Sequence, residues 1–257
     1  MKFRAALHTD KGIQKDTNQD SCCIKEAATL RGNILLAVIC DGMGGLAKGE
    51  VASASLIREF SDWFERELPA LLLKELPLQE IQSSWDRIIK EQNQMIAEYG
   101  RRLHLQLGST ITALIILGNG QYIIGHVGDS RAYHITQSAI DILTEDQTVA
   151  AYEVKHSRLS ADNAQNDPRR NVLLQCVGAS RLVEPAFYYG QVGTDECIML
   201  CSDGFRHVIS SEEILNAFSP NHNDDEKIMK KHIEQLIELN KYRHETDNIT
   251  ALLIKTV

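Results

Sequence analysis

The most constraining feature of this sequence is a repeated arrangement in which an apolar, strand-like run leads into an aspartate beside a glycine. It occurs at Asp41 in LLAVICDGMGG, at Asp129 in IIGHVGDSR and at Asp203 in CIMLCSDGF. Two further aspartates open apolar runs, Asp20 in TNQDSCCI and Asp247 in ETDNITALLI. A single Asp-Gly or Asp-Asn pair is ordinary turn chemistry, in which the carboxylate caps its own backbone. A turn needs no long strand leading into it, so the repetition predicts strand ends that converge at one rim of a packed core.

Convergence would gather several carboxylates in one cleft, and electrostatics would then require a cation. Two carboxylates ~4 Å apart repel by ~4 kcal/mol at an effective dielectric constant of ~20. A larger cluster takes up protons or separates unless positive charge lies within it. The motifs offer oxygen ligands without His or Cys, which favours Mg²⁺ or Mn²⁺ over zinc. A pair of such ions activates water for in-line displacement, so the pattern indicates hydrolysis of a phosphate ester.

The order of the expected elements indicates the fold class. Short runs rich in Val and Ile predict strands over residues 3–8, 21–25, 34–40, 111–116, 122–127, 132–135, 186–192, 197–201 and 249–254. Apolar periodicity predicts helices over 50–68, from Pro77 onward and around 228–239. This order is not a steady strand–helix alternation. We therefore expect an α+β fold with packed antiparallel sheets and helices outside, in one domain over 1–257 with an irregular flap at 147–170.

The second helix carries the longest periodic pattern. Its expected buried face comprises Ile81, Trp85, Ile88, Ile89, Met95, Ile96, Tyr99 and Leu103.

Composition excludes several classes of protein. The 257 residues carry a formal net charge of −8, which argues against nucleic acid as the main partner. No apolar run approaches the ~20 residues that span a bilayer, and the N-terminal residues lack the apolar stretch of an export signal. Six cysteines without such a signal are expected to be reduced thiols. We therefore expect a cytoplasmic protein with no membrane partner.

The glycine-rich segment after Asp41 allows two interpretations. Gly42, Gly44, Gly45 and Gly49 let the backbone approach an ion closely. The same segment satisfies G-x-G-x-x-A, with Asp62 about 20 residues on, as in a dinucleotide-binding fingerprint. Asp62 falls within a helical stretch that a second helix follows, so no βαβ unit closes. The ion-binding interpretation is therefore preferred.

Several segments closely resemble the motif series of the PPM family, the metal-dependent type 2C Ser/Thr protein phosphatases, in its short bacterial form. They are TNQDS (17–21), DGMGGLAKGEVAS (41–53), GSTITALII (108–116), GHVGDSRAYHI (125–135), LTEDQTV (143–149), CSDGF (201–205) and ETDNITALLI (245–254). They occur in the family's order over nearly the whole chain. The resemblance implies a four-layer αββα sandwich with a centre of two Mn²⁺ or Mg²⁺ ions at one rim.

The resemblance also implies roles for individual residues. Metal ligation would fall to Asp20, Asp41, Gly42, Asp129, Asp203 and Asp247. Asp41 would bridge both ions, and Gly42 would use its carbonyl. Asp20 would act through a metal-bound water, and Asp129 would share a weaker third site with Asp203. A water that bridges the metals would attack phosphorus directly, without a phosphoenzyme.

Three positions depart from the family's usual residues. Lys15 stands where an arginine usually holds the substrate phosphate, so the charge is kept and the bidentate fork is lost. Met43 stands where some members have a histidine general acid, which leaves the proton donor unidentified. Gln147 replaces a common histidine at the start of the flap.

These observations support two hypotheses of different classes. In the first, the chain is a phosphatase that acts on phosphoserine and phosphothreonine in proteins phosphorylated by a Ser/Thr kinase, with Asp41, Asp203, Asp247 and Lys15 as its catalytic residues. In the second, it is a catalytically silent member of the fold that binds signalling partners. Loss of a metal-ligand aspartate would favour the second, and none is lost. We expect a monomer in either case.

Overall fold

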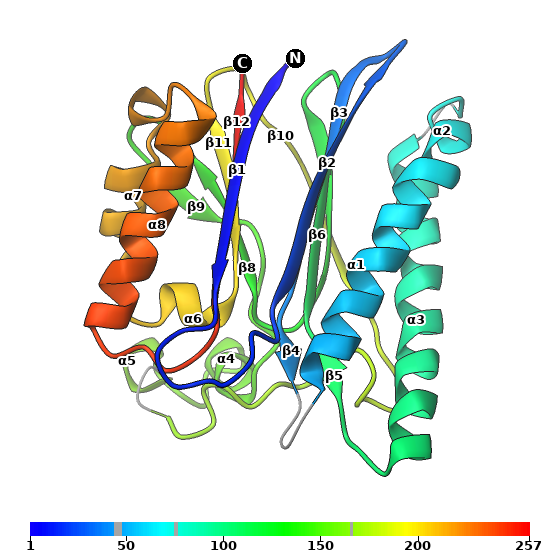
Figure 1. Cartoon of the computed structure of the whole chain (residues 1–257), viewed down its shortest axis with the longest axis vertical. Coiled ribbons are helices and arrows are strands. Elements are labelled where there is room, and N and C mark those ends of the chain that lie inside the picture. Colours follow the sequence, from blue (N-terminus) through cyan, green and yellow to red (C-terminus); the bar gives the residue numbers. More distant parts are fainter. Residues whose placement is uncertain (44–47, 75–76, 165–166) are drawn as a thin grey trace.

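The protein is a four-layer sandwich in which two antiparallel sheets pack face to face and helices cover both outer faces (Figure 1). The computed structural model describes residues 1–43, 48–74, 77–164 and 167–257. One five-stranded sheet has the order β1 (Phe3–Asp10), β12 (Ile249–Thr256), β11 (Cys197–Cys201), β8 (Arg131–Ile135) and β9 (Ile140–Ile142). The other has the order β10 (Ala186–Gln191), β7 (Gln121–Val127), β6 (Ile111–Ile116), β3 (Gly32–Cys40) and β2 (Ser21–Thr29). This architecture confirms the expected α+β sandwich.

The helices divide between the two outer layers. The sheet that contains β3 is covered by α1 (Gly49–Arg66), α2 (Leu68–Leu71) and α3 (Pro77–Leu103). The sheet that contains β12 is covered by α6 (Asp203–Arg206), α7 (Ser211–Phe218) and α8 (Glu226–Tyr242), with a short 3₁₀ turn at Pro220–His222. Two further helices, α4 (Val149–Lys155) and α5 (Ala161–Ala164), lie between β9 and β10. None of the helices in the described ranges is long and apolar enough to cross a bilayer.

Strand β3 shows why its sequence is continuously apolar. Successive strand side chains point to opposite faces of the sheet. Leu36 and Val38 pack into the core beneath α1 and α3, whereas Leu35, Ala37 and Ile39 pack into the core between the two sheets. Both faces of the strand are buried, so it carries no polar alternation.

The expected strands are all observed, with ends that shift by a few residues. The sequence analysis missed the short strands β4 (Gly42–Met43), β5 (Gly108–Ser109) and β9, which are too brief to show a period. It also missed α7, although the capping box between Ser210 and Glu213 marks its start. The flap expected at 147–170 was described as irregular, but it contains α4, which Thr148 caps through a hydrogen bond from Ala151 N. Residues 165–166 of this flap lie outside the described ranges.

The expected buried face of α3 is correct only for part of its length. Ile81, Trp85, Ile88, Ile89 and Ile96 are buried, but the side chains of three other members are largely exposed, namely Met95, Tyr99 and Leu103. The helix continues past the edge of the sheet that it covers (Figure 1). Its last turns therefore keep an apolar stripe without a sheet beneath them.

The dinucleotide interpretation is wrong for this fold. Strand β3 pairs antiparallel with both β2 and β6, so it does not belong to a parallel βαβ unit. Asp62 lies inside α1. Gly44 and Gly45, which belonged to both interpretations of the loop, lie outside the described residues.

Packing of Trp85 leads to a stability prediction. Its ring is fully buried against Phe60 and Trp63, at centroid distances of 5.3 and 5.4 Å. Trp85→Ala should therefore lower the free energy of unfolding by about 3–5 kcal/mol in urea titrations. Trp85→Phe should cost less, because the buried indole N–H has no hydrogen-bond partner to lose. Tyr242→Ala, at a side chain that is 82% exposed, is the control, and an equal loss there would contradict the prediction.

Candidate metal centre

The predicted aspartates all lie at one end of the sandwich, opposite the two chain termini. Asp41 follows the last residue of β3, Asp129 follows β7, and Asp203 begins α6 directly after β11. Asp20 and Asp247 precede β2 and β12. In Figure 1, the loop after β1 and the segment that leads into β12 both lie at the lower rim of the two sheets. The expected convergence of strand ends therefore occurs.

Strand register explains which acids become neighbours. Ser21 pairs with Cys40 across β2 and β3, which brings Asp20 next to Asp41. Cys201 pairs with Ala251 across β11 and β12, so the segments that carry Asp203 and Asp247 also meet at the rim. Antiparallel pairing thus places the end of one strand beside the start of its neighbour.

The electrostatics of the rim show that these carboxyl groups interact. Burial raises the pKa of Asp41 well above its usual value, and the charges of Asp20, Asp203, Asp129 and Asp247 raise it further. Burial likewise raises the pKa of Asp20 to about 7, with added repulsion from Asp203 and Asp247. The same cause raises the pKa of Asp129 to about 7, where Asp203 is the principal repelling neighbour. Without added positive charge, the cluster resists full ionisation.

Among the predicted metal ligands, two buried carboxylate oxygens lack a hydrogen-bond partner in the described structure. They are Oδ1 of Asp20 and Oδ1 of Asp203. The other oxygen of Asp20 accepts a 2.6 Å hydrogen bond from Thr250 Oγ1, which fixes the carboxylate plane. Buried acceptors are normally satisfied, so unpaired carboxylate oxygens in an acidic cluster are suited to coordinate a cation. Within the described ranges, no three Asp, Glu, His or Cys side chains are close enough together to form a complete metal-binding group.

Lys15 brings positive charge to this cluster. Its Nζ lies 2.8 Å from Asp247 Oδ1. Burial alone would lower the pKa of Lys15, but the hydrogen bond to Asp247 and the charges of Asp247, Asp41 and Asp203 outweigh it and raise the pKa. The ammonium group is therefore positively charged and lies among the predicted metal ligands.

The loop that carries Lys15 is tied to the segment before β12. Asn248 Nδ2 donates to the carbonyls of Lys11 and Thr17, and its Oδ1 accepts from Gln19 N at 2.8 Å. Gly12 has a φ of +75°, and a Cβ there would collide with the carbonyl of Asp247. Asn248 thus positions the whole loop.

The sequence analysis missed a set of basic and acidic partners around the rim. Arg206 donates to the carbonyl of Asp129 at 2.9 Å. His207 lies 3.4 Å from Asp203 Oδ2 and 3.2 Å from Glu245 Oε2. The signal was present, because Arg206 and His207 directly follow CSDGF. The sequence analysis assigned neither of them a role.

Comparison with known proteins decides the family. The family described as Protein phosphatase 2C matches residues 9–250. The chain belongs to this family.

Known relatives and solved structures match this type 2C phosphatase over nearly its whole length. The serine/threonine phosphatase stp of Listeria welshimeri is 31% identical, over 98% of this chain and 96% of its own. The solved S. agalactiae serine/threonine phosphatase is 28% identical, with a TM-score of 0.86 over 100% of both chains. The catalytic domain of the serine/threonine protein phosphatase PstP, solved with two manganese ions, is 27% identical, with a TM-score of 0.75 over 98% of this chain and 97% of its own.

The flap of this phosphatase is anchored beside the acidic rim. Gln147 Oε1 accepts from Gly128 N and from Gln175 Nε2, each at 2.9 Å. Gln175 Nε2 also donates to the carbonyl of Glu184 at 2.8 Å. Gln147 therefore ties the start of the flap to Gly128, the residue before Asp129. Its uncharged amide oxygen accepts the hydrogen bonds from both Gly128 and Gln175.

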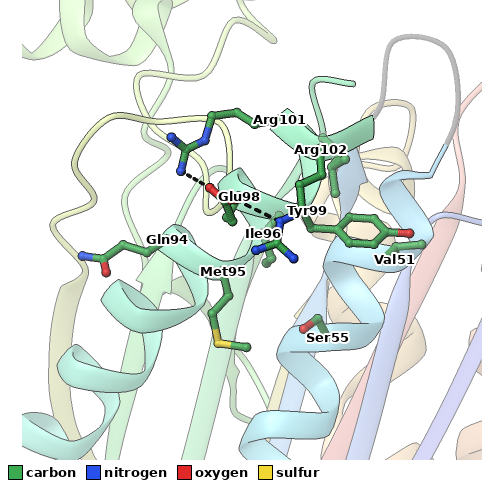
Figure 2. A pocket seen from close by; sticks show the side chains of 10 residues that line it. Val51, Ser55, Gln94, Met95, Ile96, Glu98, Tyr99, Arg101 and Arg102 are labelled. Carbon is green, nitrogen blue, oxygen red and sulfur yellow. Dashed lines mark hydrogen bonds and ion pairs between the residues drawn. The ribbon is translucent and has the colours of Figure 1, made fainter. Parts of the chain in front are cut away.

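A groove in the described part of the chain is lined by none of the predicted acids. It has a volume of about 590 Å³ and lies between α1 and the last turns of α3. Figure 2 shows Tyr99 reaching toward Val51, with Arg101 and Arg102 both directed at Glu98. The exposed stripe of α3 forms one wall. The aspartate chemistry argues for the rim and not for this groove as the reaction site.

Repulsion within the rim predicts a pH dependence for the metal-free protein. The pKa of Asp20 rises from 3.8 to about 7 on folding, so the folded state holds this proton more tightly than the unfolded state. Its stabilising contribution is complete below about pH 4 and is lost as the pH rises toward about 7. In EDTA, the melting temperature should fall over this window, and Asp20→Asn should flatten the fall. Exposed Asp16, changed to Asn, is the matched control from the same loop. A profile for Asp20→Asn that parallels the wild type would contradict the prediction.

Proposed function

We propose that this chain hydrolyses phosphoserine and phosphothreonine in protein substrates at a centre of two divalent cations, Mn²⁺ or Mg²⁺. The observation that carries the proposal is the pair of unpartnered, buried oxygens on Asp20 and Asp203 within a cluster of mutually repelling acids. Membership of the Protein phosphatase 2C family supplies the reaction class, and metal-dependent catalysis is typical of that family. The solved PstP domain with two manganese ions supports the number and the kind of ion.

The residues that would hold the ions follow from the rim. Asp41, Asp203 and Asp247 would be the principal carboxylate ligands, with the Gly42 carbonyl beside Asp41 and Asp20 reached through water. Bound there, divalent cations would supply the charge that makes water a nucleophile at neutral pH and offsets the charge of the phosphoryl oxygens. Asp129 lies at the edge of the same cluster, where burial and the charge of Asp203 raise its pKa to about 7.

The chain's own groups would orient the reactants. Thr250 Oγ1 donates to Asp20 Oδ2 and forms a second hydrogen bond with Thr9 Oγ1 at 2.7 Å, so the plane of the Asp20 carboxylate is fixed. Lys15 Nζ is a partly exposed cation of the site, with a side chain that is 41% exposed. It could leave Asp247 to bind a phosphoryl oxygen once cations compensate the acids.

The substrates are phosphorylated proteins, and we infer that they are targets of a Ser/Thr kinase. The names of the relatives support this class, because the Listeria and S. agalactiae proteins are serine/threonine phosphatases. A silent binding module is not favoured, since every aspartate expected to bind metal is present at the rim.

Loss of a central carboxylate should abolish turnover. Asp203→Asn should lower kcat on a phosphothreonine peptide by at least ~10³-fold, because the lost charge is needed to hold a cation at the reacting oxygen. Stopped assays with Mn²⁺ would measure this change, and circular dichroism would show that the fold is retained. Excess EDTA should abolish wild-type activity. Full activity of either the variant or the chelated enzyme would refute the proposal.

Lys15 should act mainly on substrate binding. Lys15→Ala should raise KM for the same peptide by about 10-fold with a smaller change in kcat, because a charge-assisted contact with phosphate is lost. Lys15→Arg should match or improve on wild type, since a guanidinium can form the bidentate contact. Lys90→Ala, which breaks the surface ion pair with Asp86, is the control. An unchanged KM for Lys15→Ala would remove Lys15 from the phosphate site.

A further inference from the structure

Arg206 lies against the metal centre and is used by no step of the proposed catalysis. Its side chain is only 12% exposed. Its Nη2 donates to the Asp129 carbonyl at 2.9 Å, and the same nitrogen lies 3.7 Å from Asp129 Oδ2 and 3.2 Å from Asp146 Oδ2. One buried guanidinium is thus shared between a predicted metal ligand and a carboxylate outside the ligand set.

Asp146 does not need Arg206 to balance its charge. Arg131 binds both oxygens of Asp146, with Nε and Nη2 each donating at 2.7 Å. This bidentate pair is the strongest geometry that the two groups can form. Two guanidinium groups, Arg131 and Arg206, therefore face two carboxylates, Asp146 and Asp129. The charge of Arg206 is the one available to Asp129.

Asp129 faces a largely buried guanidinium, whereas Asp247 pairs with the partly exposed ammonium of Lys15 and Asp203 lies near the His207 ring. Asp20 and Asp203 each keep a buried Oδ1 without a partner. Asp129 is equally buried, at 4% exposure, yet the guanidinium of Arg206 lies within ion-pair distance of its carboxylate. A guanidinium and a divalent ion on the same carboxylate repel each other, and the guanidinium cannot dissociate from the protein.

We propose that Arg206 takes the place of a divalent cation at Asp129, so that this phosphatase binds fewer metal ions than its carboxylates would otherwise hold. Arg206 is in this view a positioning residue that withholds Asp129 from metal ligation. The inference rests on the proposed function, because it presumes a metal centre built around Asp41 and Asp203. Removing the guanidinium should open Asp129 to one additional ion.

Counting bound Mn²⁺ tests the proposal without an activity assay. Arg206→Met keeps an unbranched stem and removes the charge. Isothermal titration with MnCl₂ up to millimolar concentration, with electron paramagnetic resonance of free Mn²⁺ as a second count, should give one more ion per chain for Arg206→Met than for wild type. Asp129→Asn added to Arg206→Met should remove that ion. Asp129→Asn in the wild-type background should leave the count unchanged.

A matched control and a second route keep the test decisive. Arg243→Met removes another guanidinium, one that pairs with Glu213 of α7 and with none of the predicted metal ligands, and should bind as many ions as wild type. Equal counts for wild type and a folded Arg206→Met would overturn the proposal. A lower count for Asp129→Asn in the wild-type background would also overturn it, and this arm decides even if Arg206→Met fails to fold. A wild type that takes up no Mn²⁺ would instead overturn the metal centre, and this inference with it.

Discussion

Mutual repulsion among buried aspartates is the constraint on which the rest of this structure depends. Asp41 interacts unfavourably with Asp20, Asp129, Asp203 and Asp247, and burial raises its pKa further. A cluster of this kind is stable only where a rigid frame holds it and positive charge is supplied. The sandwich is that frame, because its two sheets end at the same rim and their strands cannot move apart without opening the core between them.

The apolar layers provide the rigidity that the rim requires. Strand β3 is buried on both faces, with one set of side chains under α1 and α3 and the other against the partner sheet. Asp41 therefore leaves a strand fixed from two sides. Asp41 N also donates a 2.9 Å hydrogen bond to Thr110 Oγ1, which fixes the backbone just after the strand ends. Precise placement of the acids thus follows from packing remote from the chemistry.

Positive charge reaches the rim in two forms. Lys15 lies on a loop, with a side chain that is 41% exposed, and pairs with Asp247. Arg206 is largely buried and is held by the Asp129 carbonyl and by Asp146. A solvent-accessible cation suits substrate binding, and a largely buried one suits the tuning of a neighbouring carboxylate. The same acidic cluster therefore receives cations with different roles at its two sides.

The sequence by itself determined the strand-end aspartates, the sandwich of antiparallel sheets and the position of Lys15, because apolar runs and short motifs are local signals. It did not reveal the ion pairs of Arg206 with Asp129 and Asp146, or that of His207 with Glu245, because the members of each pair lie far apart in the chain. It also misplaced Met95 and Tyr99 in the core, since helical periodicity cannot show where the covered sheet ends. Which charges face each carboxylate is set by strand register and helix packing, and only the tertiary structure decides these.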